Sequence, residues 1–143
     1  MRYRFVTSAV VAAFLGIVSI GPALADVRVR IDKSSQSMTV AVNGYVQYVW
    51  PVSTGKRGYS TPLGTYRPFR LEPSWYSRKY DNAPMPHSIF FRGGYAIHGT
   101  THVSQLGRPA SRGCVRLHPF NARALFSLVR RHGMKNTRIT ITN

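Results

Sequence analysis

Hydrophobic and polar residues alternate along most of the chain from residue 27 onward. Residues 27–31 place three aliphatic side chains on one face and Arg28 and Arg30 on the other, as a half-buried β-strand does. Asn43-Gly44 then predicts a tight hairpin turn, because both residues tolerate positive φ. The same alternation predicts the remaining strands, at residues 38–42, 45–52, 65–69, 88–91 and 95–97, around Val115 and Leu117, and at 137–142.

A single segment shows helical periodicity instead. Pro119 suits the first position of a helix, and Gly133 suits a left-handed residue that ends one. Basic residues at 130–132 would stand at the negative end of the helix dipole. Apolar residues recur between these ends at three- and four-residue intervals, at Phe120, Ala124, Leu125, Leu128 and Val129. We therefore expect a mainly β fold, one antiparallel domain with one substantial helix near the C-terminus.

The beginning of the chain has the pattern of a secretory signal peptide. Arg2 and Arg4 precede an apolar run that a Gly-Pro pair interrupts, and Ala-Leu-Ala at residues 23–25 has the small-x-small form of a cleavage site. The alternative is an uncleaved membrane anchor, but the run is shorter than the roughly 20 residues that a spanning helix needs. We expect a signal peptide at residues 1–25, one folded domain at 26–143, and no stable membrane anchor after cleavage.

The charge is strongly positive. Without Arg2 and Arg4, 18 basic and 4 acidic residues give a formal charge of +14, which favours an anionic partner such as nucleic acid, anionic lipid or an acidic wall polymer. The arginines are scattered, and no RNA-recognition signature, zinc-finger spacing or basic helix occurs, so we do not expect nucleic-acid binding. The five histidines lack HExxH spacing, so we expect neither a metal nor a cofactor. We also expect the protein to be a monomer.

Residues 70–86 break the regular pattern. The segment contains Trp75, Tyr76, Tyr80 and three prolines without a clean period. In a small domain such a segment is typical of a functional lid or binding loop. The alternative is a surface excursion packed by its own aromatic side chains.

The single cysteine, Cys114, has the surroundings of a nucleophile. One thiol cannot form an internal disulfide, so a structural cross-link does not explain it. His98 lies 16 positions upstream and is a candidate base, because a neighbouring imidazole can take the thiol proton. The backbone carbonyl of Gly99 could hold the other ring N–H of that imidazole. The alternatives are an inert buried cysteine and a core histidine.

The neighbours of Cys114 also fit acyl transfer. Gly113 allows the backbone to fold sharply, so that its N–H and that of Cys114 could face a developing oxyanion. Arg116 offers a planar fork for a substrate carboxylate, and Arg112 adds positive potential that favours a thiolate. The alternative is that both arginines belong to the general basic surface.

These phrases resemble the L,D-transpeptidase catalytic domain, the YkuD-type family. The family pattern is H-G-x, a spacer, and S-x-G-C-h-R with h aliphatic. The matching phrases are H-G-T at 98–100, S-R-G-C-V-R at 111–116, V-S-T-G at 52–55, T-P-L-G-T-Y at 61–66 and Y-A-I at 95–97. The resemblance covers nearly all of residues 26–143. It departs from the pattern where Arg112 replaces the histidine of many members, and no LysM-like wall-binding module is attached.

The resemblance implies a β-sandwich-like domain that acts on peptidoglycan stem tetrapeptides in the periplasm or cell envelope. Cleavage after the L-centre of meso-diaminopimelate would release D-alanine and leave a thioester, which an amine of another stem resolves into a 3→3 cross-link. The implied catalytic residues are Cys114 (nucleophile), His98 (general base), Gly99 (carbonyl that orients the imidazole) and Gly113 (oxyanion N–H). We expect substrate contacts from Arg116, Ser111, Arg112, Tyr95, Trp75 and Tyr76.

Three other functions keep most of this pattern. With water or a free D-amino acid as acceptor, the enzyme would be an L,D-carboxypeptidase or an exchange enzyme. With a protein amine as acceptor, it would tether envelope proteins to the wall, and the reverse reaction would release them. A catalytically silent wall-binding module is the third alternative. A papain-type protease is disfavoured, because its cysteine surround is absent and His98 here precedes Cys114.

Overall fold

The computed structural model describes residues 26–143, so the predicted signal peptide lies outside the described residues. Within this range no helix is long and apolar enough to cross a membrane. The strands are β1 (Val27–Asp32), β2 (Ser37–Val42), β3 (Tyr45–Pro51), β4 (Gly64–Tyr66), β5 (Arg70–Glu72), β6 (Tyr76–Ser77), β7 (Ala83–Pro84), β8 (Ser88–Arg92), β9 (Tyr95–Gly99), β10 (Val115–Leu117) and β11 (Thr137–Thr142).

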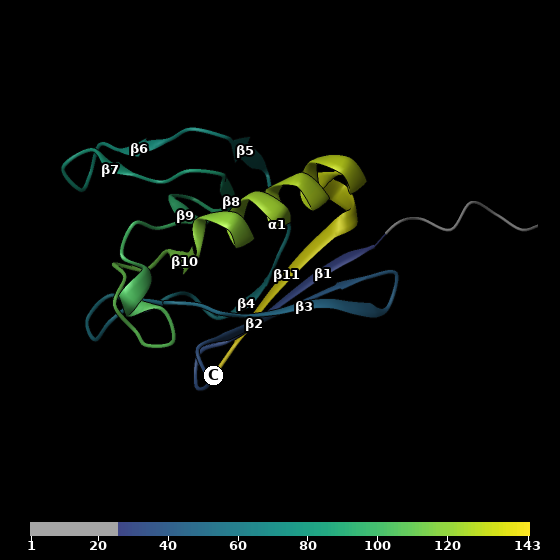
Figure 1. Cartoon of the computed structure of the whole chain (residues 1–143), viewed down its shortest axis with the longest axis horizontal. Helices are drawn as coiled ribbons and strands as arrows, with labels where there is room; N and C mark the ends of the chain where they lie inside the picture. Colours follow the sequence, from purple (N-terminus) through teal and green to yellow (C-terminus); the bar gives the residue numbers. More distant parts are fainter. Residues whose placement is uncertain (1–25) are drawn as a thin grey trace, which may run out of the picture.

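The strands form two main sheets and one small hairpin (Figure 1). The five-stranded sheet has the order β3-β2-β1-β11-β4, and the four-stranded sheet has the order β10-β9-β8-β5. Strands β6 and β7 pair only with each other, and Figure 1 shows their hairpin projecting at one end of the molecule. The mainly β fold class that the sequence predicts is confirmed.

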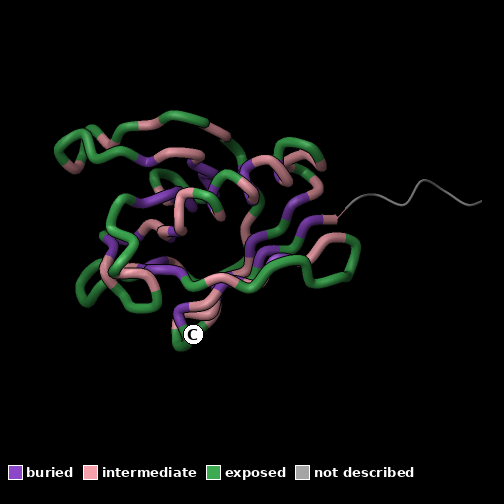
Figure 2. Tube along the Cα trace, viewed as in Figure 1, coloured by how far each residue is buried: buried purple, intermediate pink, exposed green. Residues whose placement is uncertain are grey.

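The first strand shows how the alternating pattern produces the sheet. Val27, Val29 and Ile31 are buried, while Arg28 and Arg30 are exposed, and Figure 2 shows this alternation along the strands. The predicted turn after β2 also forms, with Asn43 at φ 52° and Gly44 at φ 84°. Both values are positive, as a type I′ hairpin turn requires.

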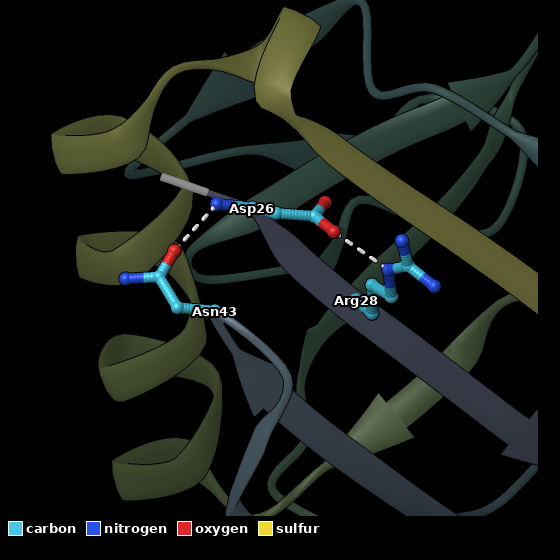
Figure 3. A network of polar contacts seen from close by, with 3 residues as sticks. All are labelled: Asp26, Arg28 and Asn43. Atoms are coloured by element: carbon cyan, nitrogen blue, oxygen red, sulfur yellow. Dashed lines mark hydrogen bonds and ion pairs between the residues drawn. The ribbon is translucent and has the colours of Figure 1, made fainter. Parts of the chain in front are cut away.

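The beginning of β1 is held by a small polar network (Figure 3). The backbone N–H of Asp26 donates to Asn43 Oδ1 at 3.0 Å, and the Asn43 N–H donates to the Asp26 carbonyl at 2.9 Å. The Asp26 carboxylate accepts from Arg28 Nε at 2.6 Å. The start of β1 is therefore tied to the turn between β2 and β3.

The expectation of a wholly antiparallel domain is wrong at two places. Strand β1 pairs in parallel with β11, and β10 pairs in parallel with β9. Parallel neighbours need a crossover connection rather than a hairpin. The loop that contains the 3₁₀ helix η1 (Val103–Gln105) supplies it between β9 and β10, and β1 and β11 lie at opposite ends of the sequence. The alternating pattern identifies the buried face of each strand but not the direction of its partner.

The predicted helix is α1 (Pro119–His132), followed by the 3₁₀ helix η2 (Met134–Asn136). Gly133 follows α1 with φ 95° and ψ 144°, so it has positive φ but lies outside the left-handed helical region expected for it. The buried face of α1 joins the core between the two sheets. That face consists of Ala122, Leu125, Phe126 and Val129.

The other face of the four-stranded sheet is covered by the irregular segment. Phe90 and Ala96 point away from the main core and form a second cluster with Met85, against which Trp75 and Cys114 pack. The Trp75 and Phe90 rings meet edge to face with centroids 5.6 Å apart. Residues 70–86, which we expect to be without regular structure, therefore contain β5 and the β6–β7 hairpin and place Cys114 beneath them.

Candidate active site

The two motifs that carry the candidate chemistry, around His98 and Cys114, contribute residues to the lining of one pocket of about 400 Å³. Cys114, His98 and Arg116 line it, together with residues of the β6–β7 hairpin. The walls therefore come from three parts of the chain: the ends of β9 and β10, the loops around them, and the hairpin above.

Strand register brings the cysteine and the histidine to the same face. Arg116 of β10 lies opposite His98 of β9, so two residues earlier Cys114 lies beside Ala96. The backbone of Ala96 acts to lower the pKa of the Cys114 thiol, which agrees with this placement. Since side chains on a strand alternate, Cys114 and His98 are diagonal neighbours on one face of the sheet.

The histidine is oriented by main chain. His98 Nδ1 donates to the Gly99 carbonyl oxygen at 2.7 Å, because that oxygen can only accept. Nε2 is then the unprotonated ring nitrogen and can accept a proton. Gly99 is fixed in turn, since its N–H donates to the Pro86 carbonyl at 2.9 Å. The predicted pairing of His98 with Gly99 is present in the structure.

Close packing explains why a glycine follows the histidine. A Cβ atom at Gly99 would lie 3.1 Å from Pro86 Cγ, 3.3 Å from Pro119 Cα and 3.4 Å from Ala122 Cβ. A side chain would therefore push the strand away from α1. The absence of a side chain at Gly99 lets the imidazole sit against this carbonyl in a buried position.

Burial keeps the imidazole neutral. His98 is only 6% exposed, and this burial lowers its pKa to about 4. The hydrogen bond to Gly99 opposes the change, and the positive charge of Arg116 adds a smaller lowering contribution. At neutral pH His98 is therefore a proton acceptor rather than an imidazolium.

The turn before Cys114 is held by Ser111. Its hydroxyl donates to the Cys114 carbonyl at 2.5 Å and accepts from the Gly113 N–H at 3.1 Å. Gly113 has φ +120°, and a Cβ there would lie 2.7 Å from Tyr95 Cε1. Both its conformation and this contact require glycine.

These contacts bear on three predicted site residues. The N–H of Gly113, expected to face an oxyanion, is bonded to Ser111 in this structure. Ser111 is one of the residues that line the pocket, but it is buried and its hydroxyl is bonded within the turn. Tyr95 packs against Gly113 instead of lining the pocket. Ser111 and Tyr95 thus shape the turn, and the contribution of Gly113 to an oxyanion site stays a prediction.

Burial also sets the state of the thiol. It raises the pKa of Cys114 above its ordinary value of 9.0, while the Ala96 hydrogen bond and the positive charge of Arg116 act weakly in the other direction. The sulfur lies 3.8 Å from the Gly94 carbonyl, to which the thiol donates. The substrate-free site therefore pairs a neutral thiol with a neutral imidazole.

The two flanking arginines are held differently. Arg116 donates to Gln105 Oε1 at 3.1 Å and remains on the pocket wall. The Arg112 guanidinium lies 4.7 Å from the centre of the Tyr80 ring, which connects the cysteine turn to the hairpin by a cation–π contact. Both arginines line the pocket, and their contact with substrate stays a prediction.

The aromatic residues chosen from the sequence are not those that line the pocket. Trp75 packs on Phe90 and beneath Arg70, whose guanidinium lies 4.5 Å from its ring centre, and Tyr76 also lies outside the lining. Tyr80, from the same segment, lines the pocket instead. Alternation along a hairpin could have indicated this difference, but the hairpin itself was not expected.

Other residues that no sequence pattern indicated also line the pocket. Lys56 lies between β3 and β4, and its N–H donates to the Ser111 carbonyl at 2.9 Å. His102 and Gln105 follow β9 in the crossover, where no spacing signal marks them. Asp81 was not singled out either, although Asp-Asn between two short strands is a turn signal. Among residues 26–143, no group of three or more His, Cys, Asp or Glu side chains could hold a metal ion.

Comparison with known proteins agrees with this fold. Residues 26–141 match the YkuD family, described as the L,D-transpeptidase catalytic domain. YkuD of Bacillus subtilis (strain 168) is 25% identical over 117 residues, which cover 79% of this chain and 64% of that protein. The chain thus spans less than two thirds of the length of this relative.

Solved structures show the same architecture. An L,D-transpeptidase from Mycobacterium smegmatis superposes with a TM-score of 0.75 at 25% identity, covering 83% of this chain and 59% of that one. An L,D-transpeptidase from Stackebrandtia nassauensis superposes with a TM-score of 0.73 at 24% identity, covering 91% of this chain and 62% of that one. The second likeness, at this identity, shows the fold alone.

Proposed function

The chain belongs to the YkuD family of L,D-transpeptidase catalytic domains, and we therefore propose that it is a cysteine acyltransferase acting on peptidoglycan stem tetrapeptides. The observation that carries this proposal is the pairing of His98 Nδ1 with the Gly99 carbonyl beside Cys114 in one pocket. This bond leaves Nε2 as the acceptor for the thiol proton.

In the acylation step the Cys114 sulfur attacks the carbonyl carbon after the L-centre of the diaminopimelate residue. As the C–S bond forms, the thiol proton passes to His98 Nε2, and the negative charge develops on the substrate oxygen. Collapse of the tetrahedral intermediate breaks the C–N bond. His98 returns the proton to the nitrogen of D-alanine, which leaves, and the thioester remains on Cys114.

In the transfer step an amine of a second stem attacks the thioester carbonyl. As the new C–N bond forms, His98 Nε2 accepts a proton from that amine. Collapse of the tetrahedral intermediate breaks the C–S bond, and return of the proton to the sulfur regenerates the thiol. Because both partners are neutral in the free site, we propose that the proton moves as the C–S bond forms and not before. The low pKa of His98 then favours prompt return of the proton to each leaving group.

The arginines fit a substrate rich in carboxylates. Arg116 and Arg112 both line the pocket, and a guanidinium presents a planar fork of donors to a carboxylate. The overall positive charge would gather anionic stems, most strongly at low ionic strength. We propose that these two side chains bind the donor stem, with the β6–β7 hairpin lying over the thioester.

The decisive experiment is incubation of the purified protein with tetrapeptide muropeptides, followed by mass spectrometry of products and of the intact enzyme. We expect loss of D-alanine, a thioester on Cys114, and 3→3 dimers. Tripeptides alone would assign hydrolysis, exchanged stems would assign D-amino-acid exchange, and adducts with an added envelope protein would assign tethering. Products that persist in Cys114→Ala contradict the mechanism.

The proposal extends to location. A peptidoglycan substrate lies in the cell envelope, and residues 1–25 have the pattern of a cleaved signal peptide. We propose that the exported protein begins at Asp26, after cleavage. Intact mass of the protein recovered from the periplasm or envelope tests this directly, since retention of residues 1–25 would contradict it.

A further inference from the structure

Asp81 differs from the other carboxylates of residues 26–143. Asp26 pairs with Arg28 at 2.6 Å, and Glu72 pairs with Arg70 at 2.7 Å. Asp32 accepts from the Ser34 N–H at 2.8 Å and from the Ser34 hydroxyl at 2.6 Å. Asp81, although it belongs to a strongly basic domain, makes neither an ion pair nor a side-chain hydrogen bond within the described residues.

Asp81 is also the acidic residue of the pocket. The charged side chains that line the pocket with it are Lys56, Arg112 and Arg116, which are all cationic. Arg112, which contacts the hairpin, places its guanidinium over the Tyr80 ring and forms no ion pair with Asp81. The pocket therefore has a cationic wall and a single carboxylate on the hairpin above it.

Turn chemistry alone explains only part of this arrangement. Asp81 and Asn82 both have φ 50°, and the Ala83 N–H donates to the Tyr80 carbonyl at 2.9 Å, as in a type I′ turn. Asn or Gly would fill position 81 of such a turn at least as well as Asp. The turn accounts for the backbone at Asp81 but not for a negative charge among the residues that line the pocket.

We propose that Asp81 binds a primary ammonium group of the stem peptide. This inference rests on the proposed function, and it assigns to the hairpin the recognition of positive charge. Stem peptides that carry diaminopimelate present carboxylates together with an amine. Carboxylates would face Arg112 and Arg116, while the ammonium would face Asp81, so that the pocket orients a zwitterionic side chain.

The ammonium has two possible sources, the donor stem and the acceptor stem. A donor ammonium would be bound before the thioester forms, whereas an acceptor ammonium would be bound afterwards and would lose a proton before attack. Both sources use the same carboxylate, and kinetics separate them because the two stems act in successive steps.

The test uses two variants that preserve the turn. Asp81→Asn removes the charge while keeping a residue that tolerates positive φ. The double variant Asp81→Asn/Asn82→Asp keeps the net charge of the hairpin but moves the carboxylate by one position, to a residue that does not line the pocket. Thermal unfolding confirms that each variant is folded, and reaction with iodoacetamide gives the concentration of active thiol.

Two concentration dependences are measured for each protein: thioester formation against donor tetrapeptide, and dimer formation against an acceptor tripeptide with a free side-chain amine. We expect both variants to raise the half-saturating concentration of one stem about fivefold, the size of a partly exposed ion pair. A change for the donor assigns the donor ammonium, and a change for the acceptor assigns the acceptor ammonium. Where the change is for the donor, acetylating the side-chain amine of the donor stem should abolish the difference between the proteins.

Unchanged half-saturating concentrations for both stems overturn the proposal. So does a double variant that behaves like the unaltered protein, because the effect then belongs to overall charge and not to Asp81. Failure of the proposed function itself gives a different result, since the unaltered protein would then form no thioester on Cys114.

Discussion

The protonation state of the site predicts how Cys114 responds to pH. Burial raises the pKa of the thiol above 9.0 and lowers that of His98 to about 4. With a thiol pKa above 9.0, fewer than about one thiol in a hundred is ionised at pH 7. The substrate-free protein should therefore lack the thiolate–imidazolium pair found in many cysteine enzymes.

The perturbation is a change of pH, and the response is the alkylation rate of Cys114, which follows the thiolate fraction. Below the pKa this fraction rises about tenfold per pH unit, so we expect the rate to rise about a hundredfold from pH 6 to pH 8. No inflection should occur near the ordinary pKa of histidine. The rate should level off only above pH 9.

The assay is reaction with iodoacetamide followed by intact mass, at constant ionic strength. Arg116→Gln is the informative variant, because the positive charge of Arg116 lowers the pKa of Cys114. Its removal should move the whole curve to higher pH. A rate that is already constant between pH 5 and 7, with an inflection below pH 5, would show a preformed ion pair and refute the reasoning.

Three further predictions follow from the same contacts. Burial lowers the pKa of His98 from 6.5 to about 4, so on acidification the unfolded chain takes up this proton before the folded protein does, and the free energy of unfolding should fall by about 3 kcal/mol between pH 6.5 and 4. Denaturant unfolding of His98→Gln should lack that loss, and an equal dependence of unfolding free energy on pH in the two proteins would contradict the assignment. Gly113→Ala should lower the free energy of unfolding by about 1–3 kcal/mol and remove most of the activity, because φ +120° and the Tyr95 contact both oppose a side chain. Gly94→Ala is the matched control in thermal unfolding, since a Cβ at Gly94 would have no atom within 4 Å. Ser111→Ala should leave the Gly113 N–H without its partner and lower stability by about 1–3 kcal/mol with slower acylation, whereas alanine at the exposed Ser35 should change neither.

Much of the framework could be predicted because local chemistry determines it. Residues 27–31 alternate because one face of β1 is buried, and Asn43-Gly44 turns because both residues accept positive φ. The pairing of His98 with Gly99 was also accessible, since a carbonyl next to the imidazole needs no distant partner. In each case neighbours in the sequence are also neighbours in space.

The remainder depends on contacts between distant residues. Nothing in the phrase around Cys114 shows that Ser111 would occupy the Gly113 N–H, because the direction of a donor depends on how the turn folds. Whether Tyr80 or Trp75 lines the pocket depends on which face of the β6–β7 hairpin lies against the four-stranded sheet. Asp81 could not be identified as a pocket residue until the hairpin was placed over β9 and β10.

The parallel pairing of β1 with β11 has a consequence for how the protein matures. Val27 pairs with Thr137 and Asp32 with Thr142, so β1, which pairs with β2 on one side, finds the neighbour on its other side only in β11. β11 also lies between β1 and β4 in the sheet. Before β11 is synthesised, β4 therefore has no strand that joins it to β1. Pairing between strands so distant in sequence slows folding, and the five-stranded sheet cannot be completed before β11 has been synthesised. A short deletion at the C-terminus should therefore be far more damaging than an extension added after Asn143.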